Sequence, residues 1–123
     1  MIPFLMIRTM TNGVIELTLA EYITLFKTLS FPVELDHMKD GVKTPFGTYT
    51  FRQPNFSADD RVFVKTVQFE LRVFVSKLDP AIDAEIEKMF FDNEIAWSKD
   101  EPVYIEDSNA YEIDYSFGVI VGG

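Results

Sequence analysis

The sequence predicts an α+β fold, a mainly antiparallel sheet of about five strands with two helices packed on it, in the order α-β-β-β-α-β-β. Three observations lead to this prediction. Apolar residues in 19–29 have the spacing of one helix face, and residues 67–90 change from strand to helix periodicity. Residues 110–119 alternate between apolar and polar side chains, as a half-buried strand does.

The first helix is expected to begin after Thr18, because Glu21 stands three residues later and the two can form a capping box. Ser30 and Pro32 end it. The sequence then predicts a short strand in PVELDHM, residues 32–38, and a second strand in FGTYTFR, residues 46–52. A polar segment, residues 55–62, is expected to be a loop.

The third strand is the clearest, with Val67, Phe69, Leu71, Val73 and Val75 on one face. Asp79 and Pro80 suit the cap and first position of the second helix, which Asp92-Asn93 closes. Its predicted buried stripe is Ile82, Ile86, Met89 and Phe90, and its wet side is Asp83, Glu85 and Glu87. The fourth strand is expected to be interrupted near Pro102, and the fifth follows in 110–119.

We expect residues 1–123 to form a single domain, with the core in 16–118 and residues 1–15 extended or partly disordered. The 12 Phe residues either fill one core or are partly buried when chains associate. The chain has no cysteine, which excludes disulfides, thiolate catalysis and zinc-thiolate sites. No apolar run reaches the length of a membrane span, so we expect an intracellular, soluble protein without membrane contact.

The net charge of −9 is uneven along the chain. Residues 1–78 hold 9 basic and 8 acidic side chains, whereas residues 79–123 hold 2 basic and 12 acidic ones. This asymmetry predicts a strongly negative face in the C-terminal elements and argues against binding to nucleic acid through phosphate contacts. The residues proposed for this acidic lumen or face are Asp83, Glu85, Glu87, Glu112 and Asp114.

Catalytic patterns are weak in this sequence, and we expect no enzyme, no metal and no cofactor. His37 is the only histidine, and alternation along a strand would turn its neighbour Asp36 to the other face. The serines and glycines form no nucleophile elbow and no phosphate-binding loop. Neighbouring carboxylates such as Asp59 and Asp60 would point apart.

Four segments, in their order and spacing, resemble a family of small structural proteins from long-tailed phages and prophages of Gram-positive bacteria. The segments are LFKTLSFPVELDHM (25–38), PFGTYTF (45–51), the stretch 55–90 that begins NFSADDRVF, and YIEDSNAYEIDYSF (104–117). The resemblance covers residues 16 to 117. Ser30 departs from it, because Pro is common at that position.

The resemblance implies a tail terminator or head-tail completion protein in the virion, at the head-tail junction. Such proteins have an α+β fold and form hexameric rings that cap the tail tube and join it to the head. The implied partners are further copies of the chain, the major tail tube protein and head-tail connector proteins, and DNA passes without specific binding. The alternatives are another connector, such as a stopper or adaptor, and an acidic binding module that mimics DNA.

A ring requires contacts between subunits, and exposed strands with aromatic side chains suit them. Phe56 either anchors a neighbouring subunit or the tube, or folds back on its own sheet. Phe74 is either an interface residue or a sign that the sheet is covered on both faces. The candidate interface residues are Phe56, Asp59, Asp60, Arg61, Gln68, Glu70, Arg72 and Phe74.

Overall fold

A computed structural model describes residues 10–11, 14–15, 17–53 and 65–121. The predicted α+β class is confirmed: a mixed, mostly antiparallel six-strand sheet carries two helices, in the order α-β-β-β-α-β-β-β. The elements are β1 (Met10–Thr11), β2 (Val14–Ile15), α1 (Leu19–Leu25), the 3₁₀ turn η2 (Phe26–Thr28), β3 (Val33–Leu35), β4 (Phe46–Arg52), β5 (Lys65–Val75), α2 (Pro80–Asp92), β6 (Ser98–Lys99), β7 (Val103–Ile105) and β8 (Ala110–Val121).

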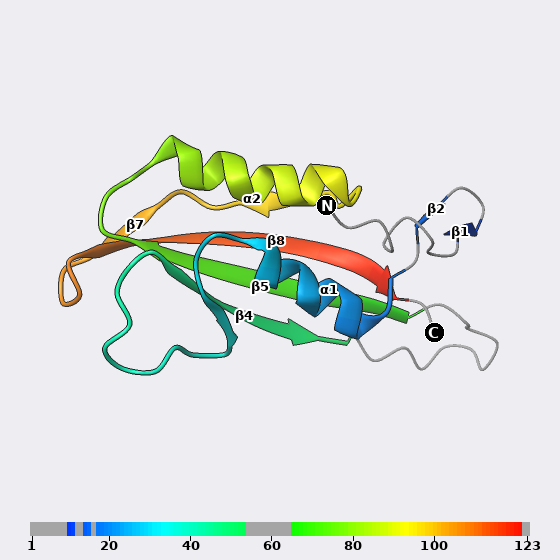
Figure 1. Ribbon diagram of the computed structural model, residues 1–123, viewed down its shortest axis with the longest axis horizontal. Helices are drawn as coiled ribbons and strands as arrows, with labels where there is room; N and C mark the ends of the chain where they lie inside the picture. The colour runs from blue at the N-terminus through cyan, green and yellow to red at the C-terminus, as the bar shows by residue number, and fades with distance from the viewer. Residues whose placement is uncertain (1–9, 12–13, 16, 54–64, 122–123) are drawn as a thin grey trace.

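The sheet is built around two long strands, β5 and β8, which pair antiparallel over 65–75 and 111–121. The strand order is β3-β4-β5-β8-β6, and β7 also pairs with β8 (Figure 1). The predicted fourth strand is therefore two short strands, β6 and β7, which lie one after the other along β8. The sheet is not wholly antiparallel, because β3 runs parallel to β4.

The first helix begins as the sequence predicts. The Thr18 hydroxyl accepts a 3.2 Å hydrogen bond from the Glu21 amide, and the Glu21 carboxylate accepts a 3.0 Å bond from the Thr18 amide. This capping box satisfies backbone donors that have no partner within a helix. The α-helix ends at Leu25, and the 3₁₀ turn η2 continues it to Thr28.

Helix α2 also has the predicted ends. The Asp79 carboxylate accepts a 3.0 Å hydrogen bond from the Ala81 amide, and Pro80 occupies the first helical position. At the other end the Asn93 side-chain amide donates a 2.8 Å bond to the Met89 carbonyl. The helix is therefore fixed in length between Asp79 and Asn93.

Both helices pack on the same face of the sheet and form one core. The Phe26 ring contacts Tyr49, Phe69 and Phe117, with a centroid distance of 4.8 Å to Tyr49. The Phe90 ring lies 4.9 Å from that of Phe117 and is fully buried. The predicted stripe of α2 is confirmed at Ile86, Met89 and Phe90, while Ile82 is half-buried. Aromatic side chains thus join the two helices to the centre of the sheet.

The relationship between Asp36 and His37 differs from the prediction. Strand β3 ends at Leu35, and Asp36 adopts a left-handed conformation with φ 68°. Strand alternation therefore does not apply to this pair, and Oδ2 of Asp36 lies 3.2 Å from Nδ1 of His37. Both side chains are largely exposed, at 71% and 82%. The pair lies outside the core, directly after β3.

Candidate interaction face

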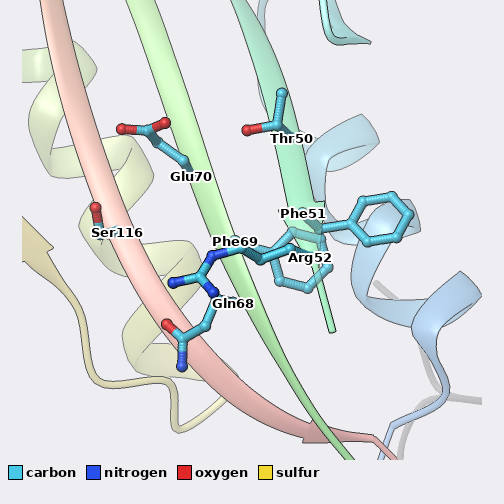
Figure 2. Close-up of a pocket in the computed structure, with 7 residues that line it drawn as sticks. All are labelled: Thr50, Phe51, Arg52, Gln68, Phe69, Glu70 and Ser116. Atoms are coloured by element: carbon cyan, nitrogen blue, oxygen red, sulfur yellow. The ribbon is translucent and has the colours of Figure 1, made fainter. Parts of the chain in front are cut away.

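The side of the sheet opposite the helices carries the second set of alternating side chains, which we call the open face. Cross-strand pairing arranges it in rows: Phe46, Phe74 and Glu112 form one row, and Thr48, Arg72 and Asp114 form the next. Thr50, Glu70 and Ser116 form the third row. Figure 2 shows the sheet from its open face. The side chains of Glu70, Thr50 and Ser116 point towards the viewer, and the helices lie behind the sheet.

One end of the open face is apolar. The Phe46 and Phe74 rings stack with their centroids 5.0 Å apart, which is a favourable cross-strand contact. Val103 in β7 is opposite Glu112 and therefore extends the same row across β8. Its side chain is 59% exposed. Phe74 thus packs on a neighbouring aromatic ring while remaining only half-buried.

A charged cluster adjoins this apolar end. Nη2 of Arg72 donates a 3.0 Å hydrogen bond to Glu70, and Nε of Arg72 lies 3.8 Å from the Glu112 carboxylate. Asp114 is directly opposite Arg72 in the antiparallel register. One guanidinium therefore faces three carboxyl groups. The pKa of Arg72 is raised, chiefly by the negative charge of Glu70.

Asp114 is the least satisfied group of this cluster. Its Oδ1 is inaccessible to solvent and has no hydrogen-bond partner within the described residues. Burial, together with the hydrogen bond and negative charge of Glu112, raises the pKa of Asp114 to about 6. The charge of Arg72 offsets it in part. The Asp114 carboxyl group therefore binds a proton more readily than an aspartate in water does.

A polar hollow of about 470 Å³ lies beyond the charged cluster (Figure 2). Figure 2 shows the Arg52 side chain reaching over β5 towards Gln68. Gly118 leaves room for Gln68, because a Cβ atom at position 118 would lie 2.6 Å from its Nε2. The lining residues are Thr50, Phe51, Arg52, Gln68, Phe69, Glu70 and Ser116.

The structure brings four of the predicted interface residues together. Gln68, Glu70, Arg72 and Phe74 all lie on the open face, as strand periodicity indicated. Phe46 was missed, although the alternation within FGTYTFR could have placed it on this face. The other predicted interface residues, Phe56, Asp59, Asp60 and Arg61, lie outside the described residues.

The five predicted acidic residues do not share one surface. Asp83, Glu85 and Glu87 are on α2, which covers the core face, whereas Glu112 and Asp114 are on the open face. Asp83, Glu85 and Glu87 are each half-buried, so the side of α2 that was predicted to face water is only partly exposed. The cause is that β6, β8 and the residue Ser30 supply polar partners to Asp83 and Glu85.

Two of these helix carboxylates are held by hydrogen bonds within the chain. Asp83 accepts bonds from the Tyr115 hydroxyl at 2.7 Å and from Lys99 Nζ at 3.1 Å. Glu85 accepts a 2.8 Å bond from the hydroxyl of Ser30, just beyond η2. Burial is the main cause that raises the pKa of Tyr115, and the hydrogen bond to Asp83 adds to it. The Tyr115 hydroxyl therefore keeps its proton and donates it to Asp83 in the hydrogen bond. Asp83 and Glu85 therefore help to fix α2 in place.

The described part of the chain contains no group of three or more potential metal ligands. No described helix has the length and hydropathy of a membrane-spanning segment. Comparisons of the chain with protein-family models, curated proteins and solved structures gave no match.

Proposed function

We propose that this protein is a phage structural protein, a tail terminator that forms a hexameric ring, caps the tail tube and joins it to the head. The observation that carries the proposal is the resemblance of residues 16–117 to that family. Its implied α+β fold agrees with the fold described above. The function is therefore one of assembly, with no chemical step.

The quoted segments correspond to structural units. PFGTYTF spans nearly all of β4, and YIEDSNAYEIDYSF contains part of β7, the turn and most of β8. The stretch that ends at Phe90 contains β5, the Asp79 cap and most of α2. The resemblance thus follows the order of the elements that build the sheet and its second helix.

The open face supports an assembly role because it offers side chains suited to protein contacts. An aromatic pair, Phe46 and Phe74, adjoins the charged groups Glu70, Arg72 and Glu112. Interfaces typically combine aromatic residues and Arg at their centre with a polar rim. Within the described strands, β3 and the β6–β7 line are the two edges of the sheet. A neighbouring subunit can approach either edge or the open face.

The alternative of a DNA-mimic module has less support. Such a module needs a row of solvated carboxylates on one surface, and here Asp83 and Glu85 accept hydrogen bonds from this chain. Glu112 and Asp114 lie on the opposite face of the sheet. Another connector role, as a stopper or adaptor, rests on the same resemblance. It differs from a tail terminator in the task that the ring performs at the head-tail junction.

Light scattering of the purified protein, alone and with the tail tube protein of the same phage or prophage, tests the proposal. We expect a ring of defined mass either in isolation or on the tube. A monomer under both conditions would contradict the proposed ring. Two variants then show which surface makes the ring contacts. Phe91→Ala changes a helix side chain that is 77% exposed, and Phe74→Thr changes the open face. The variant that prevents ring formation identifies the contact surface.

A further inference from the structure

We propose that the open face binds an extended segment of a partner protein, with an apolar side chain over Phe46 and Phe74 and an arginine or lysine at Glu112 and Asp114. This inference does not depend on the tail function. It assigns a chemistry to the partner: a short basic and apolar stretch in a strand-like conformation.

The apolar half of the site is the aromatic row. Phe46 and Phe74 stack with an interplanar angle of 26°, and both side chains are only half-buried, so part of their apolar surface remains in contact with water. Val103 lies in the same row on the far side of Glu112 and is 59% exposed. A hydrophobic side chain placed on this row would remove apolar surface from water.

The charged half of the site is short of a cation. Among the described residues, Arg72 is the single basic group of the cluster, and its close hydrogen bond goes to Glu70 at 3.0 Å. The distance from its Nε to Glu112 is longer, at 3.8 Å, and Oδ1 of Asp114 has no partner within the described residues. An incoming cation that pairs with Glu112, whose side chain is 25% exposed, and lies beside the buried Asp114 oxygen would restore charge balance.

The spacing of the two halves selects the conformation of the segment. Phe74 and Arg72 are two residues apart on β5, and Glu112 and Asp114 are two residues apart on β8. The two rows are therefore separated by about 7 Å, the distance between alternate side chains of an extended chain. A segment of the form apolar-x-basic, or its reverse, can place both side chains on these rows.

Binding is coupled to protons. Three charged groups act on Asp114: Glu112 on the same strand, Arg72 on β5, and Asp100 in the connection between β6 and β7. Arg72 in turn donates a hydrogen bond to Glu70. The pKa of Asp114 lies at about 6 in the free protein. A cation at this carboxyl group favours its ionised form, so binding releases a proton below that pKa. Affinity for a basic segment should therefore rise between pH 5 and pH 7.

Synthetic peptides test this proposal directly. The probes are acetyl-Phe-Ala-Arg-amide and acetyl-Arg-Ala-Phe-amide, and the controls replace Arg by citrulline, which has nearly the same shape without the charge. Titrations are followed by ¹H–¹⁵N spectra of the full chain at pH 5 and pH 7. The variants are Asp114→Asn and Phe74→Thr, with Asp107→Asn on the exposed β7–β8 turn as a matched control.

We expect saturable shifts at Phe46, Phe74, Glu112 and Asp114 with at least one arginine peptide. Its affinity should exceed that of the citrulline peptide about fivefold at pH 7, and less at pH 5. Asp114→Asn should abolish this difference, whereas Asp107→Asn should keep it. Equal affinity for both peptides, shifts confined to other surfaces, or no saturation at millimolar peptide would overturn the proposal. Self-association that Phe74→Thr abolishes would instead assign the face to a second copy.

Discussion

The hydroxyl of Tyr115 in β8 donates a 2.7 Å hydrogen bond to Oδ1 of Asp83 in α2. Lys99 of β6 reaches the other oxygen of the same carboxylate at 3.1 Å. One acidic side chain thus connects the helix to two strands. Because Tyr115 is fully buried, its hydroxyl depends on Asp83 for a partner.

Asp83→Ala should therefore destabilise the protein, by about 1–2 kcal/mol, since it leaves the buried Tyr115 hydroxyl without an acceptor. Tyr115→Phe should cost less, because the Asp83 side chain is 28% exposed and keeps Lys99. Urea unfolding of both variants measures these differences. The control is Tyr104→Phe, which removes a hydroxyl bonded to Asn109 on an exposed tyrosine and should change stability little. An equally large loss for Tyr104→Phe would contradict this assignment.

Adjacent phenylalanines at the end of α2 provide a test of the core. Phe90 is fully buried against Trp97, Tyr115 and Phe117, whereas Phe91 is 77% exposed. Phe90→Ala should lower the free energy of unfolding by about 3–5 kcal/mol through lost burial and a cavity. Phe91→Ala should leave it nearly unchanged. Thermal and urea unfolding measure both, and similar losses for the two variants would mean that α2 packs through another side.

Thr18 and Thr24 allow the same substitution to be compared within one helix. Thr18 caps α1, whereas the Thr24 hydroxyl only bonds back to the Ala20 carbonyl at 2.8 Å. Thr18→Ala should destabilise the protein by about 1 kcal/mol because the Glu21 amide loses its acceptor. Thr24→Ala should be neutral or slightly stabilising, since alanine has the higher helix propensity. Circular dichroism during urea unfolding distinguishes the two, and a reversed order would refute the cap.

Asp114 gives the protein a defined pH dependence. Its pKa is raised from 3.8 to about 6 by folding, so the folded state binds the proton more tightly than the unfolded state does. The stability contributed by this protonated group is present at low pH and is lost as pH rises from about 4 through about 6. Asp114→Asn does not titrate, so its stability relative to the natural chain should increase over that interval and then level off.

Urea unfolding at several pH values between 4 and 8 measures this difference. Asp107→Asn on the exposed turn is the matched control, and its difference from the natural chain should not show the same rise towards pH 6. A constant difference between Asp114→Asn and the natural chain across this range would mean that Glu112 and burial do not raise the pKa of Asp114.

The parts of the fold that the sequence predicts are those with local signals. Thr18 with Glu21 and Asp79 with Pro80 place the helix starts, and alternation in 67–75 places the sheet faces. The parallel pairing of β3 with β4 has no such signal, because it joins residues separated by a loop. The sequence also does not show that β3 ends at Leu35. Asp36 and His37 therefore lie outside the strand, and the alternation assumed for them does not apply.

The candidate site shows the same limit. Periodicity was sufficient to place Glu70, Arg72 and Phe74 on one face, yet the carboxyl groups that complete the cluster are about forty residues later on β8. Their register with Arg72 is set by tertiary pairing. Asp83 was assigned to solvent because helix periodicity cannot show that Tyr115 and Lys99 lie beneath it.

The most direct test of the proposed assembly role is electron microscopy of particles from the phage or prophage after deletion of the gene for this chain. A tail terminator limits the length of the tail tube, so we predict over-long tails that are not joined to heads, and rescue by the intact gene. Tails of normal length with full heads that leak DNA would contradict a terminator and indicate a stopper. Normal, infectious particles would contradict any role at the head-tail junction.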